Sequence, residues 1–356
     1  MENKSIQIGV VMAVYNASET LEKAIESVRN QTYTNWIMIC VDDGSSDNSF
    51  ELLQEYSRKD PRISVYTKKN GGPASARAMA YELITTPYTI YLDSDDCFSA
   101  DLLQSMASVA LRTNADAIAP NCLIEQANGS VMNWNLAYNY QVGQSMSGED
   151  AFSRVFIQPT MHGINLWRTN LLKKYAVGEN ALYNKMNADE YIQRLLFLHS
   201  KQIVFSEGAY FYNYNPKSIT KKFGIRQLGY LDTCNKFIQL SKKYSLQSGI
   251  QSMIKEYYLR HIIHLQMRLY KDGGDLSELE RKEMKDCLRK AYIDAMQYKK
   301  DFLFAEKKLS GFYKFSVTNG YSLFCFICYV LARYKQFKGK FYENKIRVMH
   351  NKVVDQ

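Results

Sequence analysis

The sequence predicts an α/β fold, with a doubly wound, mostly parallel sheet and a helical C-terminal region. Apolar runs alternate with amphipathic helical segments over the first hundred residues, polar residues follow each run, and strand signals become scarce after about residue 221. Alternation on this scale implies right-handed crossovers between parallel strands. We therefore expect a ligand-binding domain at 1–220, a mainly helical region at 221–356 and a boundary near Thr220.

The expected strands of the N-terminal half are apolar runs rich in β-branched residues, which is typical of strands buried on both faces of a sheet. They cover residues 6–14, 36–41, 63–66, 88–92 and 117–124.

The expected helices show apolar residues spaced three and four apart. Ser18 and Glu19 open the first of them, which carries Leu21, Ala24 and Val28 on one face. The others end near residue 56 or cover residues 73–85, 101–114, 188–197, 250–270 and 276–296.

Polar residues follow four successive strands at the point where each strand ends. They are Tyr15, the pair Asp42 and Asp43, the segment 70–72, and the segment 93–96. In doubly wound sheets the ligand crevice lies at the carboxyl ends of the strands. The sequence therefore predicts that these four segments converge on one cleft.

The acidic segment Asp93-Ser94-Asp95-Asp96 indicates a divalent metal site. Carboxylates this close together repel one another, and Mg²⁺ or Mn²⁺ bound with phosphate oxygens and water would relieve that repulsion. A solvated acidic loop that caps the next helix is the simpler alternative for such a segment alone. Its place at the end of a strand, beside three other polar strand ends, favours the metal site.

The segment 42–47 contains a turn and a helix N-cap, with Gly44 at the turn. Capping does not explain two consecutive acids at a strand end. A carboxylate there is suited to accept the imide N–H of uracil or a ribose hydroxyl, and Tyr15 is suited to stack on a base. In the segment 70–77 the glycines allow close approach of a ligand, and Arg77 can pair with a phosphate or with the acidic segment.

Charge and cysteine usage limit the partners and the compartment. The net charge of +9 is uneven, because residues 221–356 carry 27 Lys and Arg against 13 Asp and Glu, a net of +14. The seven cysteines are scattered, which is typical of reduced, intracellular thiols. The N-terminus lacks the pattern of a secretory signal, and the longest apolar run, 321–332, is shorter than the roughly 20 residues of a spanning helix. A cytoplasmic protein that does not cross a membrane is expected.

Four motifs together resemble family 2 glycosyltransferases, inverting bacterial enzymes of the Rossmann-like GT-A fold that build capsular, teichoic and lipopolysaccharide glycans. The motifs are Val14-Tyr-Asn16, Val41-Asp-Asp-Gly-Ser-x-Asp47, Asn70-Gly-Gly-x-Ala-x-Ala-Arg77 and Leu92-Asp-Ser-Asp-Asp96. The resemblance covers roughly residues 5–215 and implies transfer of a sugar from a nucleotide-diphosphate donor, with UDP favoured. The implied acceptor is a hydroxyl of a glycan or of a lipid-linked molecule.

The resemblance also implies the donor site. Tyr15 would stack on uracil, Asp43 with Asp42 would contact the base or ribose, and Asp95 would bind the Mn²⁺ or Mg²⁺ that bridges the diphosphate, with Asp93 in support. The other residues implied to line the nucleotide-sugar site are Ala13, Asn70, Gly72, Arg77 and Ser94.

An acidic pair at the start of a helix is implied to supply the catalytic base. Single displacement needs a group that removes the proton of the acceptor hydroxyl. Aligned on Tyr191, the pair here is Asp189-Glu190, in the reverse of the family's more usual order, and Glu190 is favoured over Asp189. The alternative is two first-turn acids stabilised by the helix dipole. The nearby segment 161–168 departs from the family, because Gly163 and Asn165 stand where many relatives have Trp and Lys. His162 and Lys217 are further candidates for holding the diphosphate.

The basic, aromatic region 307–352 favours an amphipathic helix lying on an anionic membrane surface, at the inner face of the cell membrane. A core helix of a small bundle, or a contact in a homo-oligomer, would give the same pattern.

Two other functions compete with sugar transfer. A basic nucleic-acid-binding protein would carry a recognisable module, and none is evident, so nucleic acid is not an expected partner. A nucleotidyltransferase would carry a glycine-rich basic loop after the first strand, where this chain has Tyr15-Asn-Ala-Ser18. A nucleotide-sugar hydrolase on the same fold remains an alternative.

Overall fold

The computed structural model describes residues 5–157, 162–183, 185–215, 223–302 and 319–336. The chain divides into two compact units, one of residues 1–184 with 188–218 and the other of residues 185–187 with 219–356. The boundary predicted near Thr220 lies outside the described residues. The two units are described separately below.

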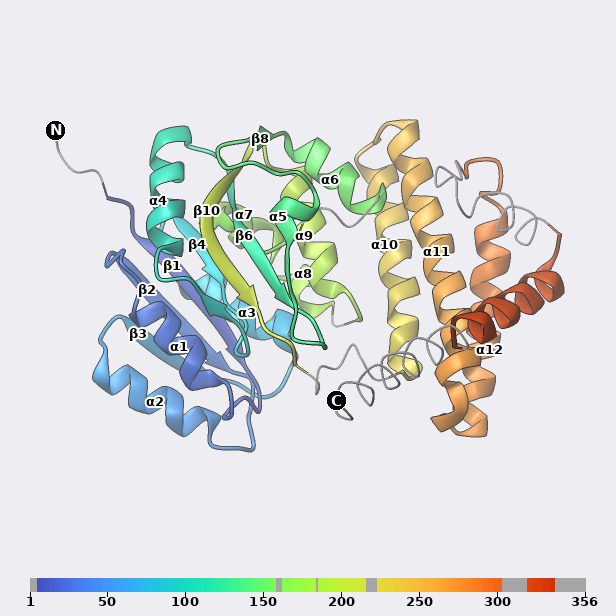
Figure 1. The fold of residues 1–356 in the computed structure, drawn as a ribbon, viewed down its shortest axis with the longest axis horizontal. Coiled ribbons are helices and arrows are strands. Elements are labelled where there is room, and N and C mark those ends of the chain that lie inside the picture. The colour runs from blue at the N-terminus through green and yellow to red at the C-terminus, as the bar shows by residue number, and fades with distance from the viewer. Residues whose placement is uncertain (1–4, 158–161, 184, 216–222, 303–318, 337–356) are drawn as a thin grey trace, which may run out of the picture. The chain divides into compact units, whose positions relative to one another are not determined.

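A mixed sheet forms the centre of the first unit, with the path β3-β2-β1-β4-β9-β6-β10-β5 (Figure 1). β7 pairs with β6, and β8 with β10. The strands are β1 (Ile8–Val14), β2 (Trp36–Asp42), β3 (Ile63–Thr67), β4 (Tyr88–Tyr91), β5 (Cys97–Phe98), β6 (Ala117–Glu125), β7 (Val131–Asn133), β8 (Ser145–Met146), β9 (Leu166–Arg168) and β10 (Ile203–Tyr212).

Six of these strands run in one direction, which confirms the mostly parallel sheet predicted from the sequence. β1 pairs in parallel with β2 and β4, β2 with β3, and β10 with β6. The short β9 is antiparallel to both β4 and β6 and lies between them, so β6 has the direction of β4.

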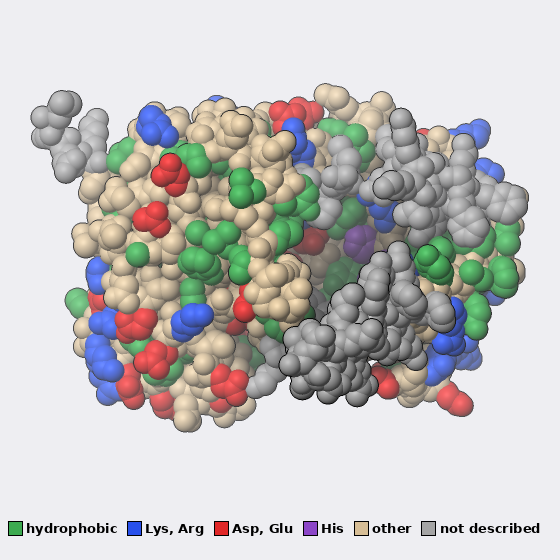
Figure 2. All heavy atoms as spheres, viewed as in Figure 1, with side chains coloured by type: hydrophobic (Ala, Val, Ile, Leu, Met, Phe, Trp, Pro, Cys, Tyr) green, Lys and Arg blue, Asp and Glu red, His purple; other side chains and the backbone are tan. Residues whose placement is uncertain are grey.

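Helices cover both faces of the sheet. They are α1 (Leu21–Arg29), α2 (Ser49–Lys59), α3 (Pro73–Leu83), α4 (Leu102–Thr113), α5 (Trp134–Ala137), α6 (Gly148–Ile157), α7 (Thr169–Tyr175), α8 (Glu179–Leu182) and α9 (Ala188–Leu198). Ile8, Val10 and Val14 of β1 point into the core cluster shared with α1, α2 and α4. Gly9 points to the opposite face, where a Cβ would meet Ile84 at the end of α3. Figure 2 shows acidic and basic side chains intermixed over the region of α1 and α2.

The carboxyl ends of the first four strands lie at one edge of the sheet. Val14 is paired with Asp42, and Asp42 with Thr67, so β1, β2 and β3 end in register. β4 follows β1 in the same direction, with Tyr91 opposite Val11. The convergence of polar strand ends predicted from the sequence is therefore confirmed.

β10 has no strong strand signal in the sequence, yet it holds the far half of the sheet together. Its pairing with β6 shifts register between Phe205 and Ala209, which marks a bulge. Gly208 lies in this bulge, and a Cβ there would be 2.5 Å from the Cα of Leu102 in α4. The close approach of β10 to α4 places the fully buried side chain of Tyr210 beneath the acidic segment that follows β4.

The described part of the second unit is helical, as predicted for the C-terminal region. It contains the 3₁₀ turns η1 (Ile225–Leu228) and η2 (Gly273–Asp275), the helices α10 (Gly229–Lys243), α11 (Ser248–Asp272) and α12 (Glu278–Met296), and a helix at residues 321–336. Ser277 and Glu280 form a capping box that starts α12. Among the residues described, no helix is both long enough and apolar enough to cross a bilayer.

Gly208→Ala should destabilise the protein by about 1–3 kcal/mol, because the added methyl group meets backbone atoms of α4 that cannot move independently. Gly224→Ala is the matched control, since its Cβ would meet nothing within 4 Å. Thermal unfolding measures both, and equal melting temperatures for the two variants would contradict the close contact.

Candidate active site

Asp42 is almost fully buried, with an exposed fraction of 2%. Its carboxylate accepts hydrogen bonds from the backbone N–H groups of Gly44 and Ser45 at 3.2 Å and from the hydroxyl of Thr67 at 3.1 Å. These contacts hold the turn after β2 and join it to the end of β3. The carboxylate is thus fully engaged within the protein.

Asp43 is equally buried and binds the loop that precedes α3. It accepts the backbone N–H groups of Gly71 at 3.0 Å and Gly72 at 2.7 Å, and it forms an ion pair with Lys68 at 3.0 Å. Gly72 has a φ of 88°, a conformation that favours glycine. Each of the two adjacent acids therefore has its own set of hydrogen-bond donors.

The acidic segment after β4 contains three carboxylates in different environments. Asp93 is paired with Arg77, and Asp95 accepts the side-chain amide of Asn215 at 2.8 Å. Asp96 is buried and accepts the hydroxyl of Tyr210 at 2.7 Å. Burial first, and the charge of Asp93 second, raise the pKa of Asp96 to about 8.

The segment after β10 is hydrogen-bonded along the acidic segment. Asn213 donates its backbone N–H to Asp96 at 2.9 Å and its side-chain amide to the carbonyl oxygen of Asp95 at 2.8 Å. Together with the Asn215 contact, these bonds fix the backbone around Asp95. The two predicted metal ligands therefore differ in their partners. The side chain of Asp95 is held by a neutral amide, whereas Asp93 is paired with the positively charged Arg77.

Arg77 is the cation at the centre of the site. Its guanidinium lies 4.6 Å from the centroid of the Tyr91 ring and pairs with Asp93. Burial works against the charge on Arg77, but Asp93 and the neighbouring tyrosines offset it, and the pKa of the guanidinium is raised. The side chain therefore stays charged where a diphosphate or sugar would approach.

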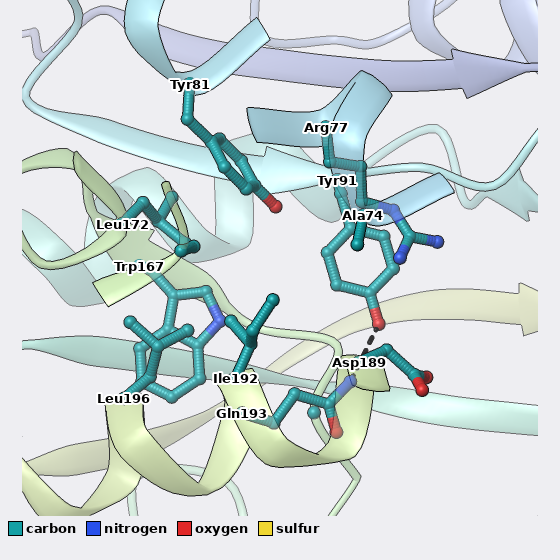
Figure 3. A pocket seen from close by; sticks show the side chains of 12 residues that line it. Ala74, Arg77, Tyr81, Tyr91, Trp167, Leu172, Asp189, Ile192, Gln193 and Leu196 are labelled. Carbon is teal, nitrogen blue, oxygen red and sulfur yellow. Dashed lines mark hydrogen bonds between the residues drawn. The ribbon is translucent and has the colours of Figure 1, made fainter. Parts of the chain in front are cut away.

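A pocket opens beside Arg77 between α3, α7, α9 and the strands β4 and β9 (Figure 3). Apolar and aromatic side chains form most of its wall, among them Tyr81, Trp167 and Ile192. Arg77 and Asp189 lie together at one end of it, on the side of the Tyr91 hydroxyl (Figure 3). The Gln193 amide donates to that hydroxyl at 3.4 Å.

Gly163 and Gln193 occupy the same corner of this pocket. A Cβ on Gly163 would lie 1.7 Å from the side-chain carbon of the Gln193 amide. The absence of a side chain at position 163 is therefore what allows Gln193 to reach Tyr91.

Asp189 and Glu190, the predicted acidic pair, begin α9 and have different partners. Glu190 forms an ion pair at 2.9 Å with Arg194, one turn further along the helix, whose side chain is only 6% exposed. Asp189 lines the pocket and remains accessible to solvent. Although its surface is open to solvent, Asp189 is surrounded by protein atoms. The resulting desolvation, followed by repulsion from Glu190, raises its pKa, while Arg77 counteracts the shift. This combination is typical of a carboxylate at the mouth of a cleft.

The other predicted residues lie at the same edge of the sheet. Tyr15 is 53% exposed just beyond β1, Asn70 is exposed, and Ala13 and Ser94 are partly buried. Burial lowers the pKa of His162 to about 4, which favours a neutral ring. Lys217 lies outside the described residues.

The predicted metal ligands after β4 do not by themselves form a complete metal site. Among the described residues, no group of three or more His, Cys, Asp or Glu side chains is placed to hold a metal ion. Carboxylate oxygens of Asp95 and Asp93 are nevertheless the ligand type that Mg²⁺ and Mn²⁺ take together with phosphate oxygens.

Residues 9–192 match the family model described as glycosyl transferase family 2, which is more than half of the chain. The chain belongs to this family. Its sequence is 27% identical over 233 residues to the glycosyltransferase GlyG of Streptococcus pneumoniae serotype 4, a match that covers 60% of this chain and 73% of GlyG.

Another relative of this family 2 chain is WfgD of Escherichia coli, a UDP-Glc:α-D-GlcNAc-diphosphoundecaprenol β-1,3-glucosyltransferase. It is 35% identical over 125 residues, which cover 35% of this chain and 49% of WfgD. The fold is similar to the crystal structure of Staphylococcus aureus TarS 1–349 in complex with UDP-GlcNAc, with a TM-score of 0.66 at 15% identity over 94% of this chain and 92% of that chain. This likeness confirms the GT-A fold.

Several side chains of this family 2 site were not among the predicted residues. They are Lys68, Tyr91, Gln193 and Asn215. Tyr91 could have been found by its place two residues before Asp93 at a strand end. The others are separated from their partners by 25 residues or more, and the sequence carries no signal of these contacts.

In metal-free protein, Asp96 should make stability fall as pH rises from about 4 to about 8. Because the pKa of Asp96 is raised in the folded state, the folded protein keeps a proton that the unfolded chain releases. The stabilisation from this proton is full below the pKa of Asp96 in the unfolded state, and it is lost as pH rises through the folded-state pKa of about 8. The slope is at most about 1.4 kcal/mol per pH unit. Asp96→Asn should remove it, while Glu51→Gln, at an exposed position of α2, should keep it. Urea unfolding across this pH range measures the difference, and parallel curves for wild type and Asp96→Asn would contradict the assignment.

Proposed function

We propose that the chain is an inverting hexosyltransferase that moves a sugar from a UDP-sugar to a hydroxyl of a glycan or lipid-linked acceptor in cell-surface polysaccharide synthesis. The single observation that carries this proposal is the pocket end where Arg77 and Asp189 meet, beside the acidic segment that contains Asp95. The names of WfgD and TarS support the choice of a UDP-linked donor, and that of WfgD supports a lipid-linked acceptor.

The nucleotide would bind across the ends of β1, β2 and β3. Tyr15 has an exposed ring suited to stack on uracil. Asp42 and Asp43 hold the two loops on either side of the expected nucleotide. Each carboxylate is already hydrogen-bonded within the protein, so it would have to give up one of these bonds to contact the base or the ribose. Asn70 and Gly72 lie on the second of these loops.

Asp95 would hold the Mn²⁺ or Mg²⁺, and Asp93 would support it. A divalent cation bound here would neutralise charge on the departing diphosphate. Arg77 pairs with Asp93 and thereby keeps that carboxylate oriented at the cleft. It also offers a permanent positive charge close to the leaving group.

We propose Asp189 as the catalytic base, in place of the Glu190 favoured from the sequence. Glu190 is engaged with Arg194, whereas Asp189 faces the pocket beside Arg77. Its raised pKa makes the carboxylate a better proton acceptor near neutral pH. In the reaction the acceptor oxygen forms a bond to the anomeric carbon as the bond to the diphosphate oxygen breaks. The diphosphate leaves with the electron pair, and the hydroxyl proton passes to Asp189.

We further propose that the enzyme works at the cytoplasmic face of the cell membrane. The seven cysteines are all free thiols, which agrees with a reducing compartment. A lipid-linked acceptor would be presented at that surface.

A UDP-sugar with Mn²⁺ should raise the melting temperature of the wild-type protein. A ligand at 100 times its dissociation constant contributes roughly 2.7 kcal/mol when it binds only the folded state. Asp95→Asn should lose most of this shift, and the control Glu51→Gln should keep it. If no UDP-sugar changes the melting temperature with or without metal, the donor assignment fails. Release of free sugar as fast without acceptor as with it would favour the alternative of a hydrolase.

Asp189→Asn should lower turnover by about 10²–10⁴-fold while the donor-dependent melting shift persists, because the amide cannot accept the proton. Glu190→Gln should weaken the contact with Arg194 and keep most of the activity. Single-turnover assays with a radiolabelled donor separate binding from transfer. Loss of activity in Glu190→Gln alone, or equal and mild losses in both variants, would contradict the assignment of Asp189 as the catalytic base.

A further inference from the structure

The helix at residues 321–336 is packed into the second unit by one face only. Phe324, Ile327, Cys328 and Ala332 are buried along this face. The Phe324 ring lies 4.8 Å from the ring of Tyr292 in α12. These contacts fix which side of the helix is turned away from the unit.

The opposite side is apolar and basic, although it faces solvent. Phe326 is 63% exposed, Tyr334 60%, and both Tyr329 and Val330 42%, at spacings of three and four residues. Arg333 is exposed among them, and residues 319–336 contain no acidic side chain. We call these five residues the aromatic-basic face. Figure 2 shows hydrophobic side chains at the surface where this helix lies, near a group of Lys and Arg side chains.

We propose that the aromatic-basic face docks on the surface of an anionic lipid bilayer. Phe326 and Val330 would enter the boundary between headgroups and acyl chains, and the tyrosine rings would lie at headgroup level. Arg333 would contact lipid phosphates. This inference goes beyond sugar transfer, because it gives the second unit a partner of its own.

Charge decides between a bilayer and a second copy of the chain. A two-fold contact would place this face against itself, and Arg333 would find no acidic partner there, because residues 319–336 contain no acidic side chain. An anionic leaflet offers the opposite charge over a wide area. The net +14 of residues 221–356 acts in the same direction.

The shape of the face also fits a flat partner such as a membrane surface better than a concave binding site on another protein. Exposed rings are arranged along one side of a single helix, and the guanidinium of Arg333 lies 5.3 Å from the Tyr329 ring, which shields its apolar stem. A helix of this kind lies in the plane of the membrane interface.

Co-sedimentation of the full-length protein with vesicles tests the proposal. Wild type should bind vesicles that contain phosphatidylglycerol and bind pure phosphatidylcholine weakly, with a loss of binding at high salt. Phe326→Ser with Tyr334→Ser should weaken binding by about tenfold or more, since each loses a buried ring. Arg333→Glu should weaken the preference for phosphatidylglycerol.

Leu279→Ser is the matched control, because Leu279 is 76% exposed on α12 and lies outside the aromatic-basic face. It should bind vesicles like wild type. All variants should keep wild-type melting temperatures and wild-type transfer to a water-soluble acceptor, so that failure here is separate from failure of the proposed reaction. Two results would overturn the inference: variants of the face that bind vesicles like wild type, or a change in oligomeric state of those variants measured by light scattering.

Discussion

A carboxylate taken out of water is costly unless hydrogen-bond donors replace the lost solvent. Asp42, Asp43 and Asp96 are such groups, and each draws its donors from a segment beyond its own strand. Asp43 ties the end of β2 to the start of α3, and Asp96 ties the end of β4 to β10. Because these buried acids must be hydrogen-bonded, the segments that supply their donors are held in place at the edge of the sheet. A site preorganised in this way needs little rearrangement when a ligand arrives.

Neighbouring acids can acquire different chemistry from their surroundings alone. Asp189 and Glu190 are adjacent in sequence, but the helix turns their side chains in different directions. Glu190 meets Arg194 on its own helix, and Asp189 meets the pocket that contains Arg77. The guanidinium of Arg194 thus gives Glu190 a partner that Asp189 does not share.

The first half of the sheet and the edge where its polar strand ends gather could be predicted, because local apolar runs and the polar residues behind them carry that information. β10 was missed because Ser206-Glu207-Gly208 interrupts its apolar pattern at the bulge. The roles of Asp42 and Asp43 were also beyond local patterns. Asp42 takes one donor from Thr67, and Asp43 takes its donors from Lys68, Gly71 and Gly72, all of them 25 residues or more away. Only tertiary packing brings these donors to the pair. The same holds for the choice between Asp189 and Glu190.

The overlap between positions 163 and 193 joins two residues that are distant in the chain. Any side chain at 163 would take the space now held by the Gln193 amide. Substitutions at the two positions should therefore occur together during evolution, with a larger residue at one accompanied by a smaller residue at the other. Changing both positions together would reshape the pocket wall next to Tyr91. A mutant library that varies only one of the two positions would consist mostly of variants in which the side chains at 163 and 193 clash or leave a gap.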